Sequence, residues 1–292
     1  MRTHRMLSTL EPLLSTLPPK TKTALLAAIN RCGTKLGMPP NWVQRWIGFA
    51  LVADALLKNR DDAASLFEIK GGAAIELRLR QHAGGIKPRA SKDLDATFRG
   101  ALDEIEGAVE QAMELARGDF SYRLITEDVH PEHMRRFSVA VSYKGDSFAR
   151  VKLEISSYEG THRTPERVLA PDLTDFGLHT TDEWPCLPLS KQVAQKIHAV
   201  TEVIDGREND RYRDLADLIL LSMLAPASPE IRDVCEETFR VRAKHGWPPS
   251  VQAPESWREP LERIAREIDL SQQDADEIVW HVQAYIDAIA SA

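Results

Sequence analysis

Two aspartates, Asp93 and Asp95, have the spacing that points most directly to chemistry, and they lie in the segment Ser91-Lys92-Asp93-Leu94-Asp95. Side chains two residues apart on a β-strand point to the same face, so both carboxylates can hold metal ions side by side. Carboxylates in this arrangement can hold Mg²⁺ between nucleotide phosphates and an attacking hydroxyl, which is what nucleotide transfer requires. Taken without their context, exposed acids at a strand end are the commoner explanation.

Glu154 is the candidate for a third metal ligand and lies in the segment Val151-Lys152-Leu153-Glu154-Ile155. Strand alternation places Glu154 and Lys152 on one face and the apolar residues on the other. If this strand is adjacent to that of Asp93 and Asp95, Glu154 completes the metal site. A solvent-facing glutamate paired with a lysine explains the same pattern equally well.

Upstream, Lys70-Gly71-Gly72 closes a short expected strand and opens a helix. Glycines let the backbone approach a phosphate closely, and the start of a helix attracts phosphate as well. A glycine pair at a strand end is by itself more often a plain tight turn. Its spacing to Ser91, Asp93 and Asp95 favours a cradle for a triphosphate.

Basic residues dominate the stretch from Lys70 to Lys92, in which Glu76 is the only acid. The further basic residues of this stretch are Arg78, Arg80, Lys87 and Arg89. The stretch is either a solvated face or the lining of a groove for an RNA backbone. The second alternative predicts salt-sensitive binding.

Two lysines, Lys191 and Lys196, compete for a role in the later, helical part of the chain. At about 100° per residue, Lys196 lies roughly 70° from the centre of the apolar stripe and Lys191 nearly opposite to it. The stripe consists of Val193, Ile197, Val200 and Ile204. Lys196 is therefore the better cleft residue, although the choice between the two lysines stays open.

A returning helix after Asp205-Gly206 has Asp214 in its first turn, so Lys196 and Asp214 can converge in a helical hairpin. Each residue also has an ordinary explanation. Asp214 interacts favourably with the helix dipole, and Arg213 with Asp217 has the spacing of a surface pair. The stem of Lys196 can pack along the stripe with its ammonium group in water.

The elements that position these residues follow the order helical, then α/β, then helical. We expect helices up to Leu17, from Lys20 to about Leu36 and after Pro39-Pro40. Strands are predicted at 66–70, 93–98, 120–125, 136–143 and 148–155, with helices at 73–81 and 101–116. Later helices are predicted at 190–204, 211–224, 230–244, 258–267 and 271–289. The expected domains are a helical segment (1–62), a mixed-sheet domain (63–185) and a helical domain that completes the cleft (186–292).

Composition narrows the class of protein. The chain has 292 residues, of which 43% are hydrophobic, enough to bury a sizeable core. The longest apolar run, from Trp46 to Ala53, is far shorter than the roughly 20 residues of a membrane span. Leucines at helical spacing around Glu11 argue against a signal peptide, and three scattered cysteines argue against a disulfide framework. We expect a cytoplasmic protein without a membrane span. With a net charge of −7, it would meet RNA through a local basic patch.

These motifs together resemble those of the AbiEii toxin family, which includes the MenT toxins. A strand that ends in Gly-Gly, a helix, and then Arg89-x-Ser91-x-Asp93-Leu94-Asp95 is similar to the first half of the family's pattern. The segment Ala194-Gln195-Lys196, followed by Arg213-Asp214-Leu215-Ala216-Asp217, is similar to the second half. The resemblance covers about Lys70 to Asp217. This chain departs from the pattern at Ala73, where the family often has a hydroxyl residue.

The resemblance implies an α+β protein with a polymerase-β-like nucleotidyltransferase domain and a mixed sheet, flanked by helical parts. It implies a toxin that transfers nucleotides from a nucleoside triphosphate to RNA, with the 3′ end of tRNA as acceptor, and that has a cognate antitoxin. Asp93 and Asp95 would hold Mg²⁺, with Glu154, which strand alternation alone suggests, as the candidate third ligand. Asp93, Lys196 and Asp214 would be catalytic. The implied nucleotide-binding residues are Lys70, Gly71, Gly72, Arg89, Ser91 and Lys196.

Two other classes remain. The segment Asp93-Leu94-Asp95-Ala96-Thr97 also fits the start of a haloacid-dehalogenase-like phosphatase, but there the first aspartate follows a buried apolar strand. Here it follows Arg89-Ala90-Ser91-Lys92, which disfavours that class. A second alternative is a protein of the same fold that binds RNA or a protein partner without turnover. The presence of Asp93, Asp95, Lys196 and Asp214 argues against it.

Overall fold

The computed structural model of the chain describes residues 17–57, 66–82, 91, 93–116, 118–126, 134–159, 164–204, 206 and 208–292. The helix expected before Leu17 and the candidate residue Arg89 lie outside these residues. The chain forms two compact units. The sheet unit comprises Met1–Ala73, Ser91–Tyr158 and Arg167–Cys186, and the helical unit comprises Ala74–Ala90, Glu159–Glu166 and Leu187–Ala292.

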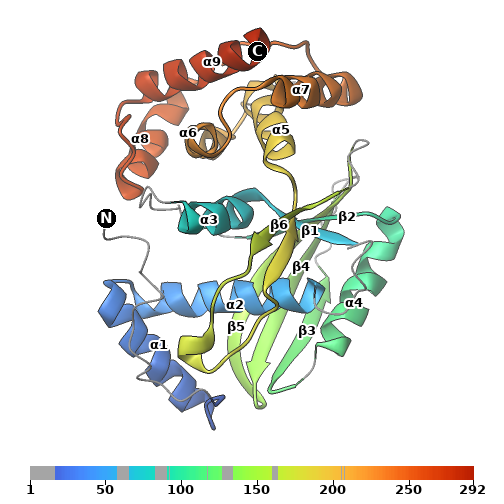
Figure 1. Cartoon of the computed structure of the whole chain (residues 1–292), viewed down its shortest axis with the longest axis vertical. Helices are drawn as coiled ribbons and strands as arrows, with labels where there is room; N and C mark the ends of the chain where they lie inside the picture. Colours follow the sequence, from blue (N-terminus) through green and yellow to red (C-terminus); the bar gives the residue numbers. More distant parts are fainter. Residues whose placement is uncertain are drawn as a thin grey trace. The chain divides into compact units, whose positions relative to one another are not determined.

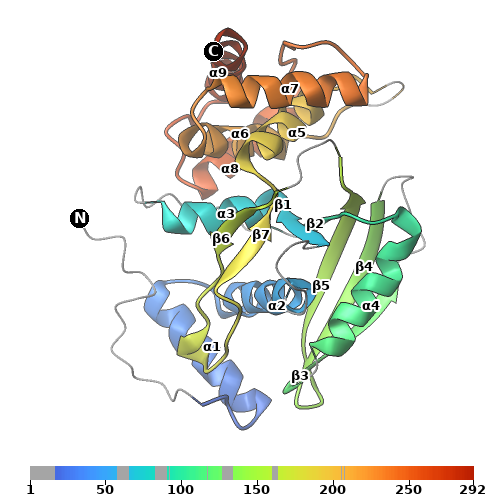
Figure 2. The ribbon, with the colours of Figure 1, turned by 45° about the vertical axis from the view of Figure 1, so that its right-hand side comes forward.

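A seven-stranded mixed sheet runs through the described part of the sheet unit (Figures 1 and 2). Its strands are β1 (Phe67–Lys70), β2 (Leu94–Phe98), β3 (Phe120–Thr126), β4 (Met134–Tyr143), β5 (Asp146–Ser157), β6 (Glu166–Leu169) and β7 (Glu183–Cys186). Their order across the sheet is β3-β4-β5-β2-β1-β7-β6. β2 runs antiparallel to β1 and parallel to β5, and β3, β4 and β5 form an antiparallel meander.

Alternating side chains give the central strands one apolar face. Leu94, Ala96 and Phe98 of β2 are buried, as are Leu153 and Ile155 of β5. Helix α2 (Pro40–Leu57) packs on β5, β4, β1 and β7, and α1 (Lys22–Leu36) packs on α2. The 3₁₀ turn η1 (Leu102–Glu104) leads into α4 (Ile105–Leu115), which contacts α2 and β3. The sheet and these helices therefore share one core.

Close approach between α2 and the sheet depends on Gly48. A Cβ atom at this position would lie 3.0 Å from the Cβ of Ala149 and 3.5 Å from Cγ2 of Val151. Both side chains belong to β5, so the helix lies on the face to which the odd-numbered residues of this strand point. The even-numbered residues of the strand's regular part, among them Glu154, point to the opposite face.

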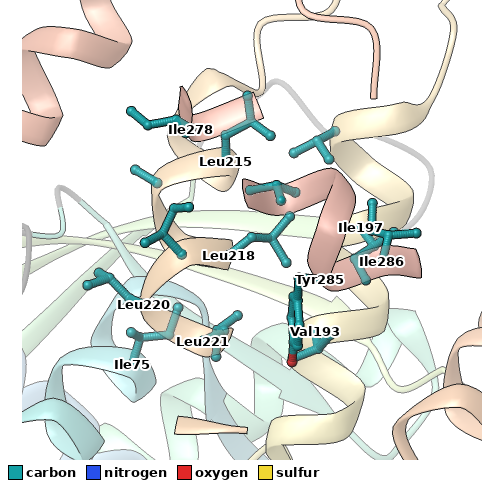
Figure 3. Packing of buried hydrophobic residues seen from close by; sticks show 14 of the residues in the cluster. Ile75, Val193, Ile197, Leu215, Leu218, Leu220, Leu221, Ile278, Tyr285 and Ile286 are labelled. Carbon is teal, nitrogen blue, oxygen red and sulfur yellow. The ribbon is translucent and has the colours of Figure 1, made fainter. Parts of the chain in front are cut away.

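The helical unit is built from most of α3 (Gly71–Gln81) and the later helices. These are α5 (Leu189–Thr201), α6 (Tyr212–Leu224), α7 (Pro229–Arg242), the 3₁₀ turn η3 (Glu255–Trp257), α8 (Arg258–Glu267) and α9 (Ala275–Ser291). Figure 3 shows their core, in which Ile75 of α3 lies by Leu220 and Leu221 of α6, with Ile197 of α5 and Ile286 of α9. The unit thus has its own continuous apolar interior.

Several helix ends follow from local sequence. Ser228 caps α7 by accepting a hydrogen bond from the Ile231 amide, with a proline in the first helical turn. Asp274 caps α9 in the same way through the amides of Asp276 and Glu277. Each of these caps fixes the residue at which its helix begins.

The expected α+β class with a mixed sheet is confirmed. Two strands, β6 and β7, were not predicted, because each has only four residues and β7 contains Pro185. The helix expected over 101–116 begins only at Ile105, after η1. Helices α1 and α2 lie in the same unit as the sheet, and the last of the boundaries between the two units along the chain falls after Cys186. Among the described residues, no helix is both long and apolar enough to span a membrane.

Candidate active site

A row of four charged residues crosses the centre of the sheet, one from each of four adjacent strands. In the strand register, Lys70 of β1 is opposite Asp95 of β2, and Asp95 is opposite Glu154 of β5. Glu154 is in turn opposite Arg136 of β4. Side chains that are directly opposite each other lie on the same face of a sheet. The row therefore has two carboxylates at its centre and a cation at each end.

The charged residues alternate along their strands with apolar residues, which point to the opposite, covered face of the sheet. Ile69, Ala96 and Ile155 alternate with the residues of the row, and each is fully buried. Asp93 lies just before β2, two residues from Asp95, and is half-buried. Alternation puts Asp95 and Glu154 on this face of their strands, and the pairing of β2 with β5 places them side by side.

The glycine pair and the acidic cluster meet at Gly71. Its φ angle is 64°, in the left-handed region that favours glycine, and it is the first residue of α3. A Cβ atom at Gly71 would collide with the carboxylate of Asp95. The backbone at the start of α3 therefore lies directly against one of the two aspartates, which the sequence could only suggest from spacing.

Neighbouring polar side chains fix the ends of these strands. Lys70 donates a hydrogen bond from Nζ to Oγ of Ser156 on β5 at 2.6 Å. The hydroxyl of Ser91 donates to the backbone carbonyl of Asp93 at 2.7 Å, and Ser91 is buried. Ser91 therefore fixes the turn before β2 and holds the segment that contains Asp93.

The donors fit Mg²⁺ with two protein ligands. Mg²⁺ binds hard oxygen ligands, usually one or two carboxylates completed by water and substrate phosphates. Asp93 and Asp95 supply such oxygens. In the described ranges, no three His, Cys, Asp or Glu side chains gather into a metal-binding group. The carboxylate of Glu154 accepts a hydrogen bond from Nε of Arg136 at 2.8 Å, so its partner is an arginine and not the lysine considered from the sequence.

A second polar cluster lies in the helical unit, between α5 and α6. Nζ of Lys196 lies 2.6 Å from Oδ1 of Asp214 and 2.8 Å from Oδ2 of Asp217. The expected convergence of Lys196 and Asp214 in a helical hairpin is confirmed. Burial by itself would lower the pKa of Lys196, but the charges of Asp214 and Asp217 outweigh it and raise that pKa above its ordinary value. Lys196 is held as a cation.

Asp217 is the member of this cluster that sequence reasoning missed. Asp217 is not the surface residue that its spacing to Arg213 suggested, because it is only 1% exposed and accepts a hydrogen bond from Nζ of Lys196. The guanidinium of Arg213 instead lies 5.2 Å from the centre of the Tyr212 ring. The sequence could have indicated Asp217 as a partner of Lys196, because Asp214 and Asp217 are three residues apart and share one side of a helix.

Lys191 has a different environment from Lys196. It is 2% exposed, and Nζ donates to Oγ1 of Thr238 at 3.2 Å, with Glu237 at 4.0 Å. Burial lowers the pKa of Lys191. This lysine is packed into the interior against α7.

Residues 55–288 match the sequence model of the family described as nucleotidyl transferase AbiEii toxin, type IV toxin–antitoxin system. The chain belongs to this family. The matched span contains the whole charged row and the Lys196 cluster, and the resemblance inferred from the motifs is confirmed. This AbiEii-family chain is thus a nucleotidyltransferase toxin of a type IV toxin–antitoxin system.

A solved structure supports the fold. MenT4, a nucleotidyltransferase toxin from Mycobacterium tuberculosis, is similar over 91% of this chain and 90% of its own, with a TM-score of 0.55 and 13% identity. A proposed nucleotidyltransferase from Helicobacter pylori is similar over 87% of this chain and 96% of its own, with a TM-score of 0.48 and 14% identity. No curated protein matches the chain.

Proposed function

We propose that this AbiEii-family protein transfers nucleotides from a nucleoside triphosphate to the 3′ end of tRNA and thereby blocks translation in the cytoplasm. The observation that carries the proposal is the contact between the start of α3 and Asp95, two residues from Asp93. It supports the proposal because a helix start can bind phosphate through its backbone amides and lies here against Asp95, one of the two carboxylates proposed to hold Mg²⁺. Family membership supplies the reaction class.

In this proposal the chain's own residues position the triphosphate. Backbone amides of Gly71 and Gly72 donate to phosphate oxygens, Lys70 adds positive charge, and Ser91 fixes the turn beside them. Arg89, outside the described residues, is a further candidate for phosphate binding. Asp93 and Asp95 would hold Mg²⁺, which neutralises charge on the transferring phosphate and makes the acceptor hydroxyl easier to deprotonate. Glu154 is the candidate for a third ligand.

Lys196 and Asp214 are proposed as catalytic residues by analogy with the family. Lys196 would contact nucleotide phosphates, and Asp214 would act near the acceptor or the base. Asp217 supports the role of Lys196, because a second carboxylate at 2.8 Å keeps the ammonium group charged and oriented. A cognate antitoxin is the expected protein partner.

The test is incubation of purified protein with Mg²⁺, total tRNA and each of the four labelled triphosphates in turn. Label on tRNA, with extension of its 3′ ends found by sequencing, supports the proposal. Asp93→Asn should abolish transfer and toxicity without loss of the fold. Asp103→Asn is the matched control, because Asp103 is exposed in η1. A fully active Asp93→Asn variant would refute the assignment.

The alternative function is a catalytically silent member of the fold that binds RNA or protein. It predicts tRNA binding without incorporation of label from any triphosphate. Release of inorganic phosphate without labelled tRNA would instead indicate the phosphatase chemistry considered from the sequence.

A further inference from the structure

The ion pair between Glu154 and Arg136 lies at the edge of the charged row and is open to solvent. The two side chains are 27% and 36% exposed, and Nε of Arg136 lies 2.8 Å from Oε1 of Glu154. Ion pairs with this exposure contribute little to stability, because water screens the attraction and two long side chains lose freedom. Breaking the ion pair between Glu154 and Arg136 should therefore cost little free energy.

A second arginine–glutamate pair on the same sheet shows the contrast. Glu68 of β1 binds Arg99, and its carboxylate is fully buried. The guanidinium of Arg99 also lies 4.0 Å from the centre of the Tyr158 ring. Arg99 is held by both contacts and therefore has a structural role. Arg136 has no comparable clamp among its described contacts.

Repulsion between neighbouring carboxylates explains why Glu154 pairs with Arg136. Asp95 and Glu154 are opposite each other on adjacent strands, and like charges in this position repel. Arg136 relieves that repulsion from the β4 side. A divalent cation at Asp93 and Asp95 would relieve it more effectively. The row by itself is neutral and, together with Asp93, net negative, and a divalent cation would make this group of five residues net positive.

We propose that Arg136 is a phosphate-binding residue of the nucleotidyltransferase site, held by Glu154 until the metal-bound triphosphate arrives. The inference rests on the proposed function and assigns a residue to which neither motif nor family resemblance pointed. Without metal, Glu154 neutralises Arg136 and the carboxylates repel phosphate. With metal, the guanidinium is freed for the triphosphate, whose oxygens match its planar set of donors.

Isothermal titration calorimetry with inorganic tripolyphosphate tests this inference without depending on the base, the acceptor or turnover. With Mg²⁺ at moderate ionic strength, Arg136→Ala should weaken binding about tenfold, the loss expected for one charge-assisted contact. Arg150→Ala is the matched control. Arg150 lies on β5, four residues before Glu154 and exposed, and its loss should change the affinity less than about twofold.

The metal-free titration separates a phosphate-binding arginine from a structural pair. Glu154→Gln should bind tripolyphosphate more tightly than the unaltered protein, because Arg136 is then free. The double variant Arg136→Ala/Glu154→Gln should lose that gain, which a general change in charge would not explain. Thermal melting confirms that each variant is folded.

Equal affinities of Arg136→Ala and Arg150→Ala would overturn the inference, as would a gain that persists in the double variant. Its failure is distinguishable from failure of the proposed function. The calorimetry reports phosphate binding by Arg136, whereas the Asp93→Asn transfer assay reports the reaction.

Discussion

Replacing Gly71 with alanine tests whether the start of α3 is built around Asp95. Two effects add at this position. The φ angle of 64° is in the left-handed region, where alanine costs about 1 kcal/mol relative to glycine. The new Cβ also collides with the Asp95 carboxylate, and overpacking of this kind costs about 1–3 kcal/mol. We expect a total loss of about 2–4 kcal/mol in the free energy of unfolding.

Gly37 provides a control with the same backbone strain and no collision. Its φ angle is 66°, and a Cβ atom there would meet nothing within 4 Å. Gly37→Ala should therefore lose only about 1 kcal/mol. Urea denaturation of both variants, followed by circular dichroism, measures the difference that belongs to the contact with Asp95.

A second substitution isolates the carboxylate. In the background of Gly71→Ala, Asp95→Ala removes the colliding atoms and should restore the stability lost by collision, though not the transfer activity. Gly71→Ala alone should also be inactive in the transfer assay, because Asp95 is displaced. Equal losses for Gly71→Ala and Gly37→Ala, with no recovery in the double variant, would refute the packing derived from the structure.

Three further predictions concern other parts of the molecule. Lys196→Met removes the ammonium group that binds the buried carboxylate of Asp217, so urea denaturation should show a loss of about 3 kcal/mol, and Lys196→Met/Asp217→Asn should recover most of it. Persistence of the loss in the double variant would contradict that account. Burial, with the charges of Arg242 and His245, lowers the pKa of His198 from 6.5 to about 4. Between pH 6.5 and 4, His198 is therefore protonated in the unfolded chain but neutral in the folded chain. The free energy of unfolding should fall as the pH drops from 6.5 to 4, by about 3 kcal/mol at pH 4. His198→Gln should remove this part of the pH dependence, whereas His179→Gln, at an exposed position, should leave it unchanged. Finally, tRNA binding should weaken steeply between low and moderate salt, and a flat salt dependence in filter binding would argue against contact with the phosphate backbone.

The order of elements could be predicted because it depends on local patterns. Strands around Asp95 and Glu154 follow from alternation with period two, and the helices that carry Lys196 and Asp214 follow from apolar stripes with period 3.6. Even the approach of Lys196 to Asp214 was accessible, since a short connection makes two successive helices neighbours. The strands β6 and β7 were not accessible, because four residues carry too little periodicity.

The residues alone established the family pattern and the acids and lysine that carry it. Only the tertiary structure decided which strands are adjacent, and therefore that Glu154 lies between Asp95 and Arg136. It also decided that Asp217 is buried beside Lys196. The physical reason is that strand register and helix contacts are set by packing between residues far apart in the chain, whereas sequence periodicity reports only which side of its own element a residue occupies.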